Sequence, residues 1–396
     1  MRIGLITGEY PPDQGGVGDF TAHLASALAA QQNEVHVITT QPEGSAMAGT
    51  QCEPAPQETP VVAVHRRLSN WGWRCWRRIA ALAGELELDL LNVQYQAAAY
   101  DLQAGVNVIP RPHARPPVVV TFHDLKVPYL FPKAGPARWW MMRWLARHAD
   151  AVIVTNEEDR LRLNEEMDLG ELHTVPIGSN IVPRRLGLHD SEAQRAGWGV
   201  GPEDLLLGFF GFLNESKGFE DLIRAVAMLV QQGLSVHLLK IGGRLGTADP
   251  TNRAYAARVE ELVTALGVND QVHWTGYSDP EEVSAALLAT DICVLPFRDG
   301  VSFRRGSLLA CLAHGRAVVT TRPRVRLREA RDGETMMLVD PRDPSGLAKA
   351  VRRLSLDPEL RARLESGAIA LAEEFSWEQI ADRTMVVFEG AAGSET

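Results

Sequence analysis

Two adjacent arginines, Arg304 and Arg305, precede the short apolar run LLACLA within the stretch DGVSFRRGSLLACLAHG. The apolar run predicts a buried helix, and a helix start already carries partial positive charge and unpaired N–H groups. Two further positive charges there favour a strongly anionic ligand, because the guanidinium fork matches the oxygens of a phosphate group. The alternative is a pair of solvated arginines on a surface turn.

A lysine occupies the same kind of position earlier in the chain. Lys217 and Gly218 begin a predicted helix in FFGFLNESKGFEDLI, directly after a strand-like run. Positive charge is unfavourable at a helix start by a few tenths to about 1 kcal/mol, and a bound phosphate easily offsets that cost. Two such helix starts in one domain can converge on a diphosphate, although Lys217 could equally be a solvated surface lysine.

Two loops in the first half have residues suited to the same chemistry. The loop GEYPPDQGGVGDF brings backbone without side chains to another helix start, at Gly15, Gly16 and Gly18. His123 ends the run VVVTFH, and a histidine there can donate to a phosphate or a sugar hydroxyl. The alternatives are a simple glycine-rich turn and a histidine whose bonds are satisfied locally.

The composition limits the possible partners. The chain of 396 residues has a formal net charge of −10, which argues against nucleic acid and requires any basic site to be local. The four cysteines lack metal-type spacing and predict reduced thiols in a cytoplasmic protein. No signal-peptide pattern or membrane-length apolar run occurs.

The elements that must position these loops follow from the alternation of apolar runs with helical patterns. Thirteen runs predict parallel strands covered on both faces: RIGLIT, EVHVITT, VVAVHR, LDLLNVQ, VVVTFHD, AVIVTN, HTVPIG, LLLGFFG, SVHLLKIG, QVHWTG, ICVLPF, AVVTT and MMLVD. Strand and helix alternate on both sides of a polar, turn-rich segment near residues 181–204. We therefore predict an α/β protein with two doubly wound domains, residues 1–183 and 184–375, and a terminal helix at 376–391. Ligands of such sheets bind beyond the carboxyl ends of the strands, where all four loops lie.

The motifs in this order resemble those of the retaining, nucleotide-sugar-dependent glycosyltransferases of family 4, also called group 1. The resemblance extends from Ile3 to about Phe388 and rests on GEYPPDQGGVGDF, TFHD, VPIGSN, FFGFLNESKGFEDLI, TGYSDPEEVSAALLATDICVLPF and LLACLAHGRAVVTT. It implies the GT-B fold, in which two Rossmann-like domains, an acceptor side followed by a donor side, face a central cleft. It also implies that the helix beginning FSWEQIA crosses back to the first domain.

The resemblance assigns roles to particular residues. The glycine loop would face the donor diphosphate and the acceptor, His123 would lie near the transferred sugar as the candidate catalytic residue, and Lys217 would bind the diphosphate. The donor sugar and phosphate would contact the turn that contains Ser302, Phe303, Arg304, Arg305, Gly306 and Ser307.

The sequence departs from the family pattern at three positions. Ser302 and Ala310 stand where the family has two glutamates, which bind the donor sugar and the ribose. Phe212 stands where the family has an arginine. Arg304 and Arg305 could restore the missing charge, could bind another anion such as an acceptor phosphate, or could remain where donor binding has been lost.

The predicted function is sugar transfer from a nucleotide-diphosphate sugar to a glycan, lipid-linked or small-molecule acceptor, by a cytoplasmic hexosyltransferase of cell-envelope polysaccharide synthesis. No cofactor and no metal are expected, since the loops carry no persuasive carboxylate cluster and the family generally works without metal. The alternative is a non-catalytic GT-B binding protein. An oxidoreductase is disfavoured because the G-x-G-x-x-G fingerprint is missing.

Two basic, tryptophan-rich segments, residues 71–78 and 138–147, predict peripheral contact with an anionic membrane. Their tryptophans and arginines are Trp71, Trp73, Trp76, Arg74, Arg77 and Arg78, then Trp139, Trp140, Trp144, Arg138, Arg143 and Arg147. The alternative is that these tryptophans pack in the core with arginine stems alongside.

Overall fold

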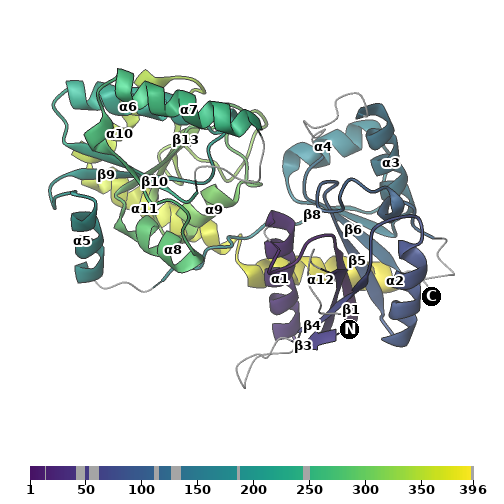
Figure 1. The fold of residues 1–396 in the computed structure, drawn as a ribbon. Helices are drawn as coiled ribbons and strands as arrows, with labels where there is room; N and C mark the ends of the chain where they lie inside the picture. Colours follow the sequence, from purple (N-terminus) through teal and green to yellow (C-terminus); the bar gives the residue numbers. More distant parts are fainter. Residues whose placement is uncertain are drawn as a thin grey trace. The chain divides into compact units, whose positions relative to one another are not determined.

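The computed structural model divides the chain into two compact units (Figure 1). Unit 1 contains residues 1–178 and 377–396, and unit 2 contains residues 179–376. The structure describes residues 1–13, 15–41, 50–52, 62–110, 116–125, 135–184, 188–243 and 250–393. Unit 1 therefore ends a few residues before the boundary predicted at 183, and the terminal helix belongs with it.

Unit 1 is built on an eight-stranded sheet with the order β3-β4-β2-β1-β5-β6-β7-β8. Its strands are β1 (Arg2–Thr7), β2 (Glu34–Thr40), β3 (Thr50–Cys52), β4 (Val62–Leu68), β5 (Leu90–Tyr95), β6 (Val118–Phe122), β7 (Ala151–Val154) and β8 (Leu172–Thr174). Neighbouring strands are parallel except β3 and β4. The order reverses direction between β1 and β5, which makes their carboxyl ends the switch point of this sheet.

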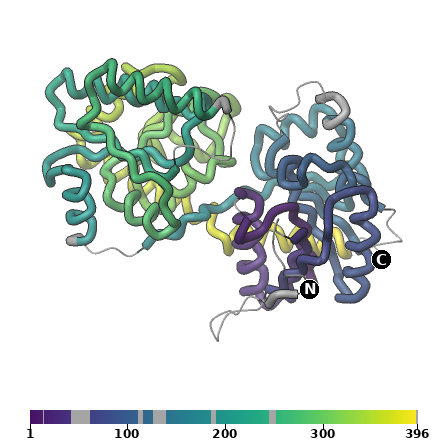
Figure 2. The backbone as a smooth tube through the Cα atoms, viewed as in Figure 1, coloured from purple at the N-terminus to yellow at the C-terminus, as the bar shows by residue number. Residues whose placement is uncertain are grey.

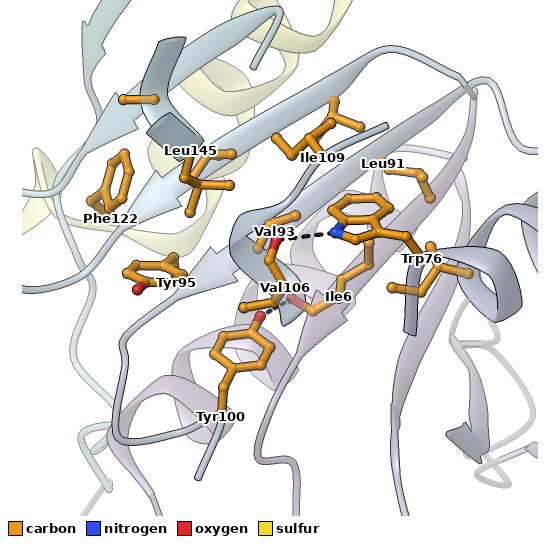
Figure 3. Close-up of a cluster of buried hydrophobic side chains, with 14 of the residues drawn as sticks. Ile6, Trp76, Leu91, Val93, Tyr95, Tyr100, Val106, Ile109, Phe122 and Leu145 are labelled. Atoms are coloured by element: carbon orange, nitrogen blue, oxygen red, sulfur yellow. Dashed lines mark hydrogen bonds between the residues drawn. The ribbon is translucent and has the colours of Figure 1, made fainter. Parts of the chain in front are cut away.

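Helices cover both faces of this sheet. They are α1 (Gly16–Ala30), α2 (Cys75–Glu85), the short 3-10 helix η1 (Gly105–Asn107), α3 (Gly135–His148), α4 (Glu157–Glu166) and α12 (Trp377–Gly393). One apolar cluster joins the sheet to α2, α3 and α4, and the other joins it to α1 and α12. Figure 3 shows the first cluster, where Trp76 donates its indole N–H to the carbonyl of Val106 at 3.1 Å. Burial on both faces explains the continuous apolar runs of the strands.

Unit 2 is built on a six-stranded, fully parallel sheet with the order β11-β10-β9-β12-β13-β14. Its strands are β9 (Leu205–Phe210), β10 (Val236–Ile241), β11 (Val272–Trp274), β12 (Ile292–Leu295), β13 (Ala317–Thr321) and β14 (Met337–Val339). The strand order reverses between β9 and β12. The loops that follow these two strands carry Lys217 and the arginine pair, so the predicted donor residues lie at the switch point.

The helices of unit 2 are α5 (Leu188–Gly197), η4 (Glu215–Lys217), α6 (Phe219–Gln231), α7 (Pro250–Ala265), η5 (Asn269–Gln271), α8 (Pro280–Ala289), α9 (Gly306–Ala313), α10 (Pro344–Leu356) and α11 (Pro358–Glu373). Helix α6 packs against α7 and α10, whereas α8 packs against α5 and α11 against α9 (Figure 1). Local sequence sets several helix starts, as at α8, where Asp279 and Glu282 form a capping box and Pro280 is the first helical residue.

The chain returns to unit 1 at Trp377, as the yellow C-terminal segment of Figure 2 shows. The Trp377 ring stacks on His23 of α1 with ring centres 5.0 Å apart. A Cβ atom added to Gly178 would lie 2.7 Å from the Trp377 ring. The two points at which the chain passes between the units therefore lie side by side, and only a glycine fits against the indole.

Each of the thirteen apolar runs that predicted a strand contributes to one, and the two doubly wound sheets are confirmed. Strand β3 was not predicted, because its three residues contain no apolar run, and it pairs antiparallel with β4.

Candidate functional site

Lys217 is positioned by a tight turn between β9 and α6. The side chain of Asn214 accepts the Lys217 backbone N–H at 3.1 Å and caps the short 3-10 turn. Gly218 follows with φ +67°, and a Cβ atom at this position would lie 2.1 Å from the carbonyl oxygen of Pro296. Glycine is required here by both the backbone conformation and the close approach of the loop after β12.

The Lys217 ammonium group lies at the carboxyl end of β9. A Cβ atom on Gly211 would lie 2.3 Å from the Lys217 Nζ and 3.8 Å from the Ser307 Cβ. Burial lowers the pKa of Lys217 to about 8, and the positive charge of Arg305 adds to the effect. The structure thus brings Lys217 together with the first turn of α9 and with Arg305, as the prediction of converging helix starts requires.

Both arginines are held by one carboxylate that the sequence analysis overlooked. Asp299 accepts from Arg305, and its other oxygen lies 3.5 Å from a guanidinium nitrogen of Arg304. The three side chains are only 13–16% exposed. The Arg305 guanidinium also covers the ring of Phe297 at 4.3 Å. Asp299 therefore offsets part of the positive charge that Arg304 and Arg305 would otherwise present to a ligand.

Arg298, the neighbour of Asp299, joins the two cationic loops. Its guanidinium donates to Asp221 at 2.9 and 3.2 Å and to Glu220 at 2.9 Å, and these acids lie in the first turn of α6. Its backbone N–H donates to the carbonyl of Ser216 at 2.8 Å. The ion pair with Asp221 raises the pKa of Arg298 further above its usual value. The sequence could have indicated both residues, because Arg298 and Asp299 are adjacent opposite charges in LPFRDG, just beyond the end of a predicted strand.

The rest of the predicted donor turn lies between β12 and α9. Ser302 has a buried hydroxyl oxygen with no hydrogen-bond partner among the described residues. Phe303 stacks on Phe375 with ring centres 4.7 Å apart, so it packs within unit 2. Gly306 and Ser307 open α9, where the first amide groups have no partner inside the helix.

The departures from the family pattern have different surroundings. Ala310 is fully buried in α9, so its position offers no polar group to a ribose. Phe212, in place of an expected arginine, is 47% exposed and follows Gly211 at the end of β9. The cation that lies beside Lys217 therefore comes from the β12–α9 loop as Arg305, and Phe212 presents an aromatic face at the switch point.

In unit 1, a carboxylate already occupies the helix start that the glycine loop was expected to offer to a ligand. Glu9 accepts the backbone N–H groups of Val17 and Gly18 at 2.9 and 3.2 Å. A Cβ atom on Gly15 would lie 2.1 Å from this carboxyl group, whereas one on Gly16 would meet nothing within 4 Å. Burial raises the pKa of Glu9. The glycines thus let a side chain of the protein itself reach the α1 amides, which sequence reasoning missed.

His123 lies at the carboxyl end of β6, as predicted. Its Nε2 is 2.8 Å from the Gln94 Oε1, and its ring meets the edge of Phe20 in α1 at 4.6 Å. Burial lowers the pKa of His123 to about 3, so the ring is neutral at physiological pH. In the tautomer that makes this hydrogen bond, Nε2 carries the proton toward Gln94 and Nδ1 is an acceptor.

The two tryptophan-rich segments are only partly exposed. Trp71 and Trp76 are buried, and Trp139 is covered by the guanidinium of Arg162 at 4.1 Å. The exposed members are Trp73, Trp140 and Trp144, at 76%, 63% and 40%. Of Arg138 only the backbone lies within the described residues. The alternative of packed tryptophans therefore holds for Trp71 and Trp76, and peripheral membrane contact stays a prediction for the exposed members.

Two kinds of feature are missing from the described residues. No group of three or more His, Cys, Asp or Glu side chains in that part of the chain is arranged to hold a metal ion. No helix there is both long and apolar enough to cross a bilayer.

Two family profiles match the chain in succession. Residues 14–181 match Glycosyltransferase Family 4, and residues 204–357 match Glycosyl transferases group 1. The chain is 27% identical to a D-inositol 3-phosphate glycosyltransferase of Corynebacterium efficiens, an alignment that covers 100% of this chain and 96% of the relative. It is 23% identical to an MMP alpha-(1->4)-mannosyltransferase of Mycolicibacterium hassiacum, covering 99% and 98%.

Solved structures resemble the chain over nearly its whole length. Sucrose-phosphate synthase from Thermosynechococcus elongatus has a TM-score of 0.74 at 20% identity, with 99% of both chains covered. The Anabaena protein HepE, in complex with UDP and glucose, has a TM-score of 0.73 at 18% identity, with 98% of both covered. The predicted fold and family are thus confirmed, and the chain belongs to the group 1 glycosyltransferases of GT-B type.

Proposed function

We propose that this chain transfers a hexosyl group from a nucleoside-diphosphate sugar to an acceptor, with retention of anomeric configuration. The observation that carries the proposal is the meeting of Lys217 with Arg305 and the start of α9 at the β9–β12 switch point. Two cations from separate strand–helix junctions suit a diphosphate, and HepE, which resembles this chain, was solved with UDP. Retention follows from the family resemblance.

Departure of the diphosphate is the step that this arrangement would assist. Lys217 and Arg305 would stabilise the negative charge that develops on the leaving group, and the first amides of α9 would add donors. The Ser302 hydroxyl, buried without a partner among the described residues, would bind a donor-sugar hydroxyl in place of the usual glutamate. Neutral His123 would contact the transferred sugar. Since cationic side chains supply the charge, we infer that the reaction needs neither metal nor cofactor and survives EDTA.

The acceptor is proposed to be a glycan or a lipid-linked glycan of the cell envelope. The relatives are named for transfer to inositol 3-phosphate and for mannosyl transfer, which supports a hexosyl donor and a hydroxyl acceptor. Their names are those of transferases, so they lend no support to the alternative of a non-catalytic binding protein, despite Ser302 and Ala310.

The test is a thermal-shift screen with UDP, GDP, ADP and their sugars, followed by titration of the stabilising ligand. Arg305→Ala should weaken its affinity about ten- to hundredfold, because a charge-assisted contact contributes about 1.5–3 kcal/mol. Lys217 should retain the remaining binding. Arg353→Ala, an exposed arginine in α10, removes the same charge elsewhere and should leave the affinity unchanged. Equal affinity in the Arg305 variant and the wild type would refute the proposed diphosphate site.

We also propose that the protein is cytoplasmic and contacts the inner face of the membrane through unit 1. Trp73, Trp140 and Trp144 are exposed, and arginines flank them in α2 and α3, two helices that cover the same face of the sheet. Wild-type protein should pellet with phosphatidylglycerol vesicles at low salt, and a Trp73→Ser/Trp140→Ser variant should not. Absence of wild-type pelleting would rule out this contact.

A further inference from the structure

The loop between β13 and β14 carries a basic surface for which the proposed transfer reaction has no use. The segment RPRVRLREAR contains five exposed arginines, Arg322, Arg324, Arg326, Arg328 and Arg331. Arg322 lies 3.4 Å from both Asp332 and Asp340, and Arg331 donates to Glu334 at 2.8 Å. Arg324, Arg326 and Arg328 form no ion pair with any residue in the described part of the chain. We call Arg324, Arg326 and Arg328 the arginine strip.

The backbone alternates so that the strip faces solvent. Val325 and Leu327, the residues between the arginines, are partly buried, and all three arginines are exposed. No acidic residue interrupts residues 322–328. A local charge of +3 on a chain with a net charge of −10 must act at short range, because the overall field repels anions.

The strip begins beside the candidate donor site. A Cβ atom on Gly300 would lie 2.7 Å from the carbonyl oxygen of Arg322 and 3.1 Å from the backbone nitrogen of Arg324. Gly300 has φ +81° and directly follows Asp299, the carboxylate that holds Arg304 and Arg305. The Val301 N–H also donates to the Thr321 carbonyl at 3.2 Å. A ligand bound along the strip would therefore extend from the edge of the site.

We propose that the arginine strip binds an anionic polysaccharide, the negatively charged part of the acceptor beyond the sugar that receives the transfer. This proposal rests on the proposed function and names its acceptor class. Three successive cations exceed what one diphosphate needs, and the proposed function already assigns Lys217 and Arg305 to that group. Insertion into a bilayer would require exposed apolar side chains beside the arginines, whereas Val325 and Leu327 are partly buried. Single-stranded nucleic acid would require stacking aromatics, and residues 322–331 contain none.

The experiment measures binding of a decagalacturonate probe to full-length protein at low and at physiological salt. The test variant is Arg324→Gln/Arg326→Gln/Arg328→Gln. The matched control is Arg353→Gln/Arg363→Gln/Arg383→Gln, which removes three charges from exposed positions in α10, α11 and α12. Three exposed charge pairs, each contributing about twofold, predict about tenfold weaker binding for the strip variant and less than twofold for the control. The loss should shrink as salt rises.

Further ligands distinguish an anionic polysaccharide from a neutral glycan, a membrane and a nucleic acid. A neutral dextran oligomer should not bind. The proposal is overturned if decagalacturonate fails to bind the wild type at low salt, or if the strip and control variants bind it equally. It is also overturned if phosphatidylglycerol vesicles or oligo-dT bind through the strip more strongly than decagalacturonate does. The nucleotide thermal shift should be equal in the wild type, the strip variant and the control variant. Its absence from all three would refute the proposed diphosphate site and would leave the decagalacturonate result unchanged.

Discussion

Lys217 should reduce the stability of the ligand-free protein while it serves the anion site. Its ammonium group is held at the end of β9 beside Gly211, where burial and the charge of Arg305 lower its pKa from 10.5 to about 8. At about 1.4 kcal/mol for each pH unit, that difference corresponds to about 3 kcal/mol of cost for keeping the charge in the folded state. Replacing Lys217 with methionine keeps a side chain of similar length and removes this cost.

The sign of the pH dependence follows from proton binding. Below about pH 8 the lysine is protonated in both the folded and the unfolded chain, so the full cost is present at pH 7. Between about pH 8 and 10.5 the unfolded chain binds the proton and the folded chain does not, so this group makes the protein more stable as the pH rises. A bound diphosphate supplies the opposite charge and should raise the pKa of Lys217 again.

The assay is urea unfolding of the ligand-free protein at pH 7, together with thermal shift by the nucleotide identified above. Lys217→Met should raise the free energy of unfolding by about 1–3 kcal/mol and reduce the nucleotide shift, because Arg305 remains as a single cation. Lys349→Met, at an exposed position in α10, should change neither. A Lys217 variant less stable than wild type, with nucleotide binding retained, would show that the lysine stabilises the fold and that the electrostatic reasoning is wrong.

Three further predictions concern stability measured by urea or pH titration. Gly218→Ala should lower the free energy of unfolding by about 2–4 kcal/mol, because alanine disfavours φ +67° and its Cβ would meet the Pro296 carbonyl; an effect below about 1 kcal/mol would contradict the geometry. Arg298→Met should lower the free energy of unfolding by about 3–5 kcal/mol, because it leaves buried Asp221 without its cation. Arg298→Lys should recover part of this loss, and equal losses in the two variants would argue against the ion pair. Burial lowers the pKa of His65 to about 4, so the unfolded chain binds the proton first as the pH falls. The free energy of unfolding of the wild type should therefore fall by up to about 3 kcal/mol between pH 6.5 and 4. His65→Gln should reduce this pH dependence, and an unchanged pH dependence would contradict the prediction.

The aromatic contacts around the chain crossing connect the candidate loops to the backbone between the units. Phe375 stacks on Phe303 within unit 2, and Trp377, two residues later, stacks on His23 within unit 1. Phe20, beside Trp377 at 5.3 Å, also touches His123. Each unit thus anchors its side of the crossing through an aromatic residue close to its own candidate site.

The strands and the switch-point loops could be predicted from the sequence because their signals are local. Uninterrupted apolar runs such as VVVTF specify strands buried on both faces, and alternation of strand and helix specifies parallel connections. Parallel strands bring their following loops to the same edge of a sheet, so Lys217 and Arg305 could be placed together although their positions differ by 88 in the chain (305 − 217).

The state of the charges was decided only by the tertiary structure. The carboxylate of Asp299 on the arginine pair, that of Glu9 on the α1 amides, and the low pKa of Lys217 all depend on distances between separate loops. The same holds for the burial of Trp71 and the exposure of Trp73, two residues apart in one sequence pattern. The sequence determines which side chains are available, whereas ion pairing and desolvation arise from contacts within a few ångströms, which exist only once the chain has folded.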